Sequence, residues 1–199
     1  MGREQSGMIG IFKRKKGVTI KSYSSLEGET KELVDYTIKH SLRPNPTLRK
    51  KRKDIKPKEF DFWKLKWNDI ILLRHYLKEK DVKAVHKLVY GINDKDFLRL
   101  DLFNCSACYK WVASKINDIN AIEKDRLASE PTSEEKEAGV DRLNEFDYSV
   151  ALDSLAGGDL SKYDYLLNLP YAKIFRKMCL DKTIREIQQE NLKNVSRKT

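Results

Sequence analysis

The sequence predicts a mainly α protein, a compact multi-helix bundle with an extended basic N-terminal arm. Two observations carry this prediction. Apolar residues recur at helical spacing from about residue 60 onward, between recognisable caps and stops. The positive charge is concentrated earlier: residues 1–66 hold 18 Lys and Arg against 8 Asp and Glu, whereas residues 67–199 hold 22 of each. We therefore divide the chain into an arm, residues 1–59, and a helical domain, residues 60–199.

The arm is expected to be largely irregular, with one short helix over residues 30–41. Repeated glycines interrupt residues 1–28, and Pro44 and Pro46 end the short helix, because each disfavours a helical conformation in the residue before it. Residues 47–59 are expected to form a solvated linker, since so polar and charged a stretch buries too little apolar surface to offset the entropy of ordering it.

The domain is expected to begin with two helices. Asn68 or Asp69 can cap a helix through Lys80, and Asp81 can open a shorter one that Gly91 ends. The clearest periodic signal follows, with spacings of four and three that predict a long helix facing a bundle core. The residues of this seam are Leu98, Leu102, Cys105, Tyr109, Val112, Ile116 and Ile119, widened by Trp111 and Ile122.

Further helices are expected in the last third. Thr132 and Glu135 form a capping-box pattern for a helix through about Leu143, and Gly157 ends a helix that follows Ser149. Pro170 suits the start of a final helix. Its inner face is expected to comprise Tyr171, Ile174, Phe175, Met178, Ile184 and Ile187.

We expect no enzymatic activity, no cofactor and no metal site. Cys105 and Cys108 have C-x-x-C spacing, but they lie inside the predicted long helix, with Cys105 in its periodic seam, and no second pair completes the four ligands of a zinc site. Core packing is the favoured interpretation of both. An odd count of three cysteines suits a reducing compartment. The only apolar patch near the N-terminus, residues 8–12, is too short for a signal peptide, and no run approaches a membrane span.

The stretch TLRKKRKDIKPKEFDFWKLKW, residues 47–67, holds the two candidate sites. The first is a partner-binding set of aromatic side chains: Phe60, Phe62, Trp63 and Trp67. The second, an alternative, is a polyanion-binding set: Arg49, Lys50, Lys51, Arg52 and Lys53. Basic clusters can neutralise phosphates and aromatics can stack on unpaired bases. Here the two kinds stand in consecutive blocks, and Phe60, Trp63 and Trp67 have helical spacing, so burial of the aromatics remains open.

The C-terminal half resembles small morphogenesis proteins of tailed bacteriophages. The resembling motifs are EAGVDRLNEF (137–146), LDSLAGGD (152–159) and LPYAKIF (169–175), followed by a helix rich in Glu and Gln. Residues 65–193 are similar to helical tail assembly chaperones and related connector or virion proteins of phages that infect gut Bacteroidetes. The resemblance implies no catalytic residues. The basic arm departs from the chaperones and suits a protein that stays in the particle.

The expected function is therefore that of a non-enzymatic phage structural or assembly protein, either a virion or connector component or a tail assembly chaperone. It would act through contacts with other phage structural proteins, with homo-oligomers as one form of contact, in the host cytoplasm during assembly or within the virion. The alternative is a nucleic-acid-binding module that uses residues 47–67. No membrane partner is expected.

Overall fold

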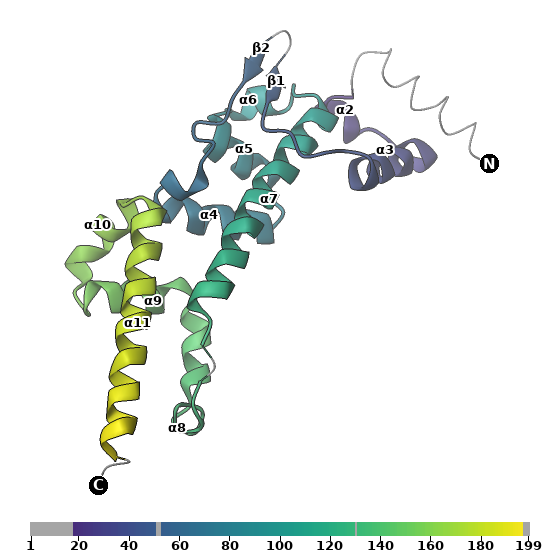
Figure 1. Ribbon diagram of the computed structural model, residues 1–199. Coiled ribbons are helices and arrows are strands. Elements are labelled where there is room, and N and C mark those ends of the chain that lie inside the picture. The colour runs from purple at the N-terminus through teal and green to yellow at the C-terminus, as the bar shows by residue number, and fades with distance from the viewer. Residues whose placement is uncertain (1–17, 51–52, 130, 197–199) are drawn as a thin grey trace. The chain divides into compact units, whose positions relative to one another are not determined.

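The computed structural model describes residues 18–50, 53–129 and 131–196, and they are mainly helical, as the sequence predicts (Figure 1). The chain divides into two units. Unit 1 comprises residues up to Phe60 together with Leu73–Lys115, and unit 2 comprises Asp61–Leu72 and the residues from Ile116 onward. This division differs from the predicted boundary after residue 59, because the described part of the predicted arm packs with residues from the middle of the chain.

Unit 1 contains most of the regular structure of the first half. Its elements are α2 (Ile20–Tyr23), α3 (Gly28–His40), β1 (Leu48–Lys50), β2 (Lys53–Ile55), the second half of α4 (Trp67–Lys78), α5 (Val82–Tyr90), α6 (Asp94–Phe97) and the first half of α7 (Leu102–Leu127). Asp81 caps α5 through its carboxylate, which accepts from the Ala84 N–H at 2.9 Å, and Gly91 ends that helix in the left-handed conformation. The predicted start and stop of this helix are confirmed.

The predicted seam of α7 is buried over most of its length. Leu102, Cys105, Val112, Ile116 and Ile119 are all buried, so the periodic signal marked a true core face. Its two ends differ from the prediction: Leu98 precedes the helix and is 48% exposed, and Ile122 is 41% exposed.

The described part of the predicted arm folds against α7 within unit 1. The backbone N–H of Leu102 donates to Val18 O at 2.7 Å, and Ile20 N–H donates to Leu100 O at 3.1 Å. Lys110 Nζ donates to Lys39 O at 3.1 Å, and Val34 of α3 is 1% exposed. Residues 18–50 and 53–59 therefore pack within unit 1, and the short helix expected over residues 30–41 corresponds to α3. Residues 1–17 lie outside the described residues.

Unit 2 is built from short helices and one long one. It contains η1 (Phe62–Lys64), α8 (Ser133–Glu137), η2 (Val140–Phe146), α9 (Tyr148–Ala156), η3 (Leu160–Lys162), α10 (Tyr163–Asn168) and α11 (Tyr171–Ser196), with the first half of α4 and the second half of α7. The capping box of Thr132 and Glu135 is confirmed, but α8 ends at Glu137 instead of near Leu143, because Gly139 turns the chain in the left-handed conformation.

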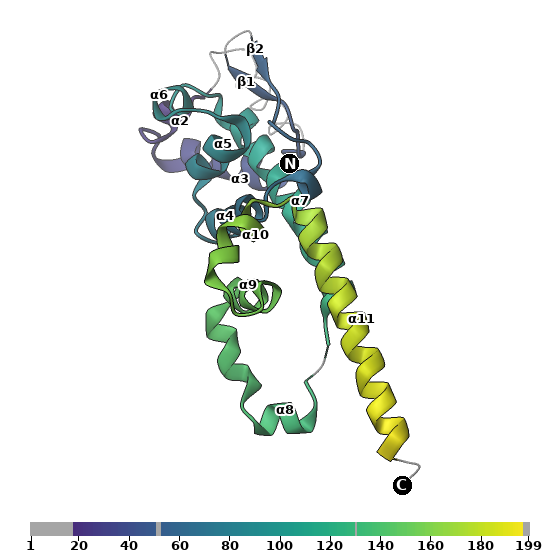
Figure 2. The same ribbon diagram turned by 90° about the vertical axis from the view of Figure 1, so that its left-hand side faces the viewer.

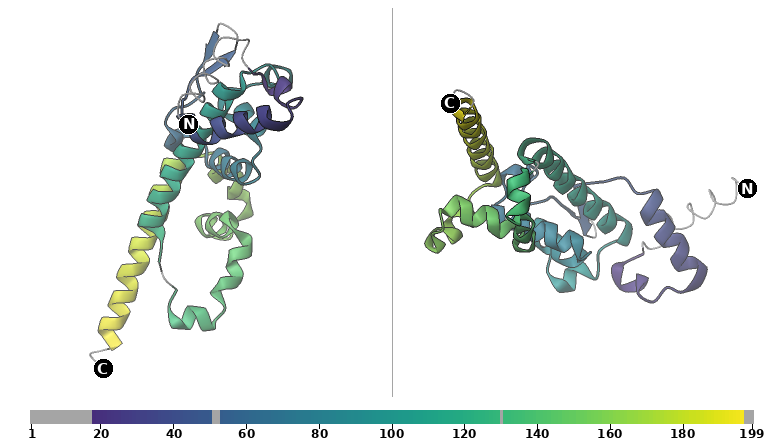
Figure 3. Two further views of the ribbon diagram at one scale, coloured as in Figure 1. Left: turned by 90° about the vertical axis from the view of Figure 1, so that its right-hand side faces the viewer. Right: turned by 90° about the horizontal axis from the view of Figure 1, so that it is seen from below.

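The starts of α4 and α11 are tied together within unit 2. Trp67 N–H donates to Leu169 O at 2.9 Å, and Tyr171 N–H donates to Leu65 O at 2.8 Å, which makes a short antiparallel bridge. Tyr171 and Ile174 are buried beside it. From there α11 continues, and its C-terminal end projects beyond the other helices of the unit (Figures 2 and 3).

Candidate functional site

Arg49, Lys50 and Lys53, the described residues of the basic run predicted to bind polyanions, belong to two short antiparallel strands, here called the hairpin. Leu48 pairs with Ile55, Arg49 with Asp54 and Lys50 with Lys53. Side chains alternate along a strand, so Leu48 turns inward and is completely buried, while Arg49 turns outward. Pro57, just after β2, is also buried. The prediction of a solvated linker over residues 47–59 is therefore wrong for the described residues, since Leu48 supplies an apolar anchor.

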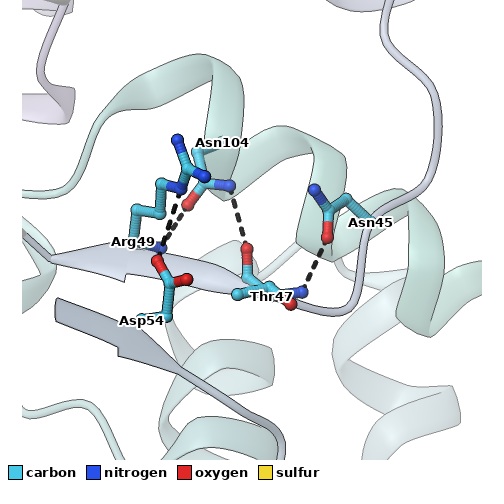
Figure 4. Close-up of polar contacts among 5 residues, drawn as sticks. All are labelled: Asn45, Thr47, Arg49, Asp54 and Asn104. Atoms are coloured by element: carbon cyan, nitrogen blue, oxygen red, sulfur yellow. Dashed lines mark hydrogen bonds and ion pairs between the residues drawn. The ribbon is translucent and has the colours of Figure 1, made fainter.

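One amide side chain holds the hairpin on helix α7. Asn104 Oδ1 accepts from the Arg49 N–H, and Asn104 Nδ2 donates to Thr47 O at 3.0 Å (Figure 4). Thr47 N–H in turn donates to Asn45 Oδ1 at 2.8 Å. Each bond satisfies a backbone group that would otherwise need another strand or water. The hairpin is thus positioned by side chains from two other segments of unit 1.

The charges of the hairpin are only partly balanced. Arg49 Nε lies 3.3 Å from Asp54 Oδ1 on the exposed face, and Lys50 Nζ pairs with Asp96 of α6. The Lys50 ammonium is the main reason that the pKa of Asp96 is lowered. Lys53, directly opposite Lys50, has no acidic partner among the described residues. Of the predicted polyanion-binding set, Lys51 and Arg52 lie outside the described residues.

The predicted partner-binding aromatics do not form one exposed surface. Phe62 and Trp67 are each only 2% exposed. Trp63 stacks on Tyr171 with ring centroids 5.5 Å apart and also contacts Phe175 at 5.0 Å. Phe60 is 48% exposed and meets Trp111 edge-on at 6.1 Å. Phe62 and Trp67 are therefore core residues here, which leaves Phe60 as the most accessible of the four.

The C-x-x-C cysteines are buried, with a histidine that the sequence patterns did not pair with them. Cys105 and Cys108 are 1% and 0% exposed, and His86 is 0% exposed. His86 Nδ1 lies 2.7 Å from Val82 O, while Nε2 lies 3.1 Å from Cys105 O and 3.3 Å from Cys105 Sγ. Burial lowers the pKa of His86, although both ring nitrogens face a backbone carbonyl oxygen, and burial raises the pKa of the Cys105 thiol. The neutral imidazole carries one N–H and so donates to one of the two carbonyls. The arrangement is a core contact.

The buried histidine makes stability depend on pH. The pKa of His86 is lower in the folded chain than the usual value of about 6.5, so the unfolded chain binds more protons between these two pKa values. We expect the free energy of unfolding to fall as the pH drops below about 6.5, by up to about 1.4 kcal/mol per pH unit in that window. Urea unfolding between about pH 7.5 and about pH 5.5 measures this.

The matched control for the pH experiment is the exposed His75. His75→Gln is expected to keep the pH dependence, whereas His86→Leu is expected to reduce it. Tyr90 and Cys105, which face His86, have raised pKa values and stay neutral across the range. A wild-type stability that rises as the pH falls through this range would contradict the assignment.

The described residues contain neither a candidate metal site nor a helix that could cross a membrane. Among the described residues, no three His, Cys, Asp or Glu side chains are placed to hold a metal ion. Asp94 pairs with Lys83 at 2.8 Å and Asp96 accepts from Asn93, so these loop carboxylates serve the start of α6. None of the described helices is both long and apolar enough to cross a membrane.

Helix α11 carries an exposed apolar stripe, two of whose three residues were predicted to lie in the core. Leu180, Ile184 and Ile187 stand four and three residues apart, on one face of the helix, and are 54%, 44% and 53% exposed. The prediction that Ile184 and Ile187 belong to an inner face is wrong, although Tyr171 and Ile174 of the same prediction are buried. Periodicity indicates an apolar face without showing whether the same chain covers it.

The two units differ in charge and in exposed apolar surface. The described residues of unit 1 contain 18 Lys and Arg against 11 Asp and Glu, a net charge of +7, and those of unit 2 contain 13 against 17, a net charge of −4. Of the 13 large hydrophobic side chains that are exposed among the described residues, 10 belong to unit 2. The basic and the apolar surfaces are therefore carried by different units.

No protein-family model, no curated protein and no solved structure matches the chain. A functional proposal therefore depends on the surfaces described above and on the sequence motifs.

Proposed function

We propose that the protein is a non-enzymatic assembly or structural protein that acts through contacts with other proteins, and that the apolar stripe of α11 is the contact surface. The stripe comprises Leu180, Ile184 and Ile187. Its exposure is the observation that supports the proposal, because scattered exposed hydrophobics are ordinary, whereas an aligned apolar face on a projecting helix is typical of a binding surface.

The chemistry of the stripe favours a helical partner. An amphipathic helix presents apolar anchors three and four residues apart, which is the spacing that a groove or a second helix accommodates. Charged residues of both signs flank the stripe on α11, among them Asp181, Arg185 and Glu186. Flanking charges of this kind fix the register of the partner more than they add affinity.

The setting that we propose is assembly of a tailed-phage particle. The resemblance of residues 65–193 to tail assembly chaperones and connector proteins supports it, and so does the acidic, apolar-rich surface of unit 2. The partner would be another structural protein of the particle. The present protein would bind it either as a virion or connector component or as a chaperone. A second copy of this chain is an alternative occupant of the same stripe.

The test replaces one residue of the stripe. Ile184→Glu is expected to weaken the contact by about 2 kcal/mol or more, roughly thirtyfold, because a charge would be buried in an apolar interface. Thermal unfolding is expected to stay close to that of the wild type, since Ile184 is 44% exposed. Co-purification after crosslinking, in the cells that produce the protein, measures partner binding, and light scattering of the purified protein measures self-association.

The matched control is Leu192→Glu. Leu192 lies on the same helix and is 70% exposed, but it is five residues from Ile187 and so points away from the stripe. A particle protein, or a second copy, that is lost with Ile184→Glu and retained with Leu192→Glu supports the proposal. Equal behaviour of the two variants, or a monomer without a co-purifying particle protein, would refute it.

A further inference from the structure

The positive charge of the hairpin continues onto α6 and its surroundings. The exposed side chains of Lys87, Lys95 and Arg99 line a hollow together with Asn93, Asp94 and Asp96. The ion pair between Lys50 and Asp96 places the tip of β1 at the rim of this hollow. Both carboxylates in the hollow already form ion pairs with lysines: Asp94 pairs with Lys83, and Asp96 pairs with Lys50. The basic residues therefore exceed the acidic ones across a continuous surface of unit 1.

This arrangement is electrostatically unfavourable on its own. Like charges directly opposite each other destabilise a strand pair, and Lys50 lies opposite Lys53. Asp96 neutralises the charge of only one of these two lysines. A phosphate bound beside the two lysines would remove this repulsion and release counterions, so the pair favours an anionic ligand.

Because the hairpin is anchored, this surface differs from that of a disordered basic tail. Leu48 is completely buried, and Asn104 holds β1 through two hydrogen bonds (Figure 4). Lys50 and Lys53 are therefore presented on strands that the fold already orders, and binding would not have to supply the entropy of ordering them.

We propose that strands β1 and β2 and the hollow beside them bind the phosphate backbone of duplex DNA, with the two strands facing the major groove. The site consists of Lys50, Lys53, Lys87, Lys95 and Arg99. The major groove of B-form DNA admits a two-stranded β-ribbon, whereas that of A-form RNA is too deep and narrow for side chains to read.

The position of the aromatic residues favours duplex over single-stranded nucleic acid at this site. Proteins that bind single strands stack the bases on exposed aromatic side chains beside a basic groove. Phe62 and Trp67 are buried, and Trp63 is stacked on Tyr171. Phe60 is 48% exposed but lies edge-on against Trp111, and one such ring does not form a platform for successive bases. Contacts to phosphate account for affinity without sequence preference.

The experiment is a fluorescence anisotropy titration of the full chain against a labelled duplex of about 20 base pairs at several salt concentrations. The same strand alone and a double-stranded RNA of equal length are the other two probes. We expect the duplex DNA to bind most tightly, with an affinity that falls steeply as salt rises. Lys53→Gln and Lys95→Gln are each expected to lower the salt slope by about 0.9, and together to weaken binding at least about tenfold at low salt.

The matched controls are Lys124→Gln and Lys173→Gln, which remove exposed lysines of unit 2. They are expected to leave the affinity and the slope unchanged, and all four variants are expected to melt like the wild type. The proposal would be overturned by absent binding at low salt, by equal or tighter binding of the single strand or the RNA, or by equal losses in the controls. None of these outcomes bears on the α11 stripe, so the two proposals stand or fall separately.

Discussion

Replacing Trp67 by alanine is expected to lower the free energy of unfolding by about 3–5 kcal/mol. Trp67 is 2% exposed at the first turn of α4, where its backbone N–H also bonds to Leu169 O. Removing the indole would leave a cavity that the surrounding helices cannot close completely, so the loss exceeds the transfer free energy of the side chain. Urea unfolding followed by far-ultraviolet circular dichroism measures the change.

The result separates a core role of Trp67 from the partner-binding role that its sequence position suggested. Phe60→Ala is the control, because Phe60 comes from the same aromatic cluster but is 48% exposed, and its removal is expected to cost well under half as much. If Trp67→Ala unfolds at the wild-type urea concentration and instead loses a binding partner, the core assignment is wrong.

Replacing Leu48 by alanine is expected to lower the free energy of unfolding by about 2–5 kcal/mol. Leu48 is completely buried and is the apolar residue of β1, so its truncation removes the packing that holds a short, highly charged hairpin on unit 1. An isolated two-stranded hairpin is at best marginally stable in water, and therefore depends on such an anchor. The same urea experiment measures the loss.

Leu98→Ala is the control for Leu48, since both leucines belong to unit 1 and Leu98 is 48% exposed. It is expected to have a clearly smaller effect. A solvated linker would tolerate Leu48→Ala within about 0.5 kcal/mol, so a change of that size would restore the interpretation of residues 47–59 as a linker.

The helical part of the fold was accessible from the sequence because its signals are local. The cap at Asp81, the left-handed glycine at Gly91 and the four-and-three spacing from Leu102 to Ile119 each depend on residues within one or two turns. The ends of such patterns are less certain. Ile122 continues the spacing but is half exposed, because burial depends on what the fold brings against it.

The hairpin was not accessible from local signals. Its strands have three residues each, and the composition around Lys50 and Lys53 is that of a disordered segment. What orders it is Asn104, more than 50 residues away in the chain, together with the burial of Leu48. Long-range pairing of this kind leaves no periodic trace in the sequence.

The candidate surfaces, too, could be predicted from the sequence only in part. The basic character of residues 49–53 was evident from the sequence, whereas the neighbouring Lys95 and Arg99 joined it only through the ion pair of Lys50 with Asp96. The spacing of the aromatic residues in the sequence did not show whether they are buried. The structure places Phe62 in a short 3₁₀ turn that the Asp61 side chain caps. For Ile184, an apolar helical face was correctly identified but assigned to the wrong environment.

The amide of Asn104 has a consequence for solubility. In the register of the hairpin, the N–H of Arg49 and the C=O of Thr47 belong to the edge of β1 that faces away from β2, which is where a strand of another molecule would add. A side chain already occupies both groups, so intermolecular sheet growth along this edge would first have to displace it. Asn104 thereby hinders edge-to-edge aggregation of the hairpin.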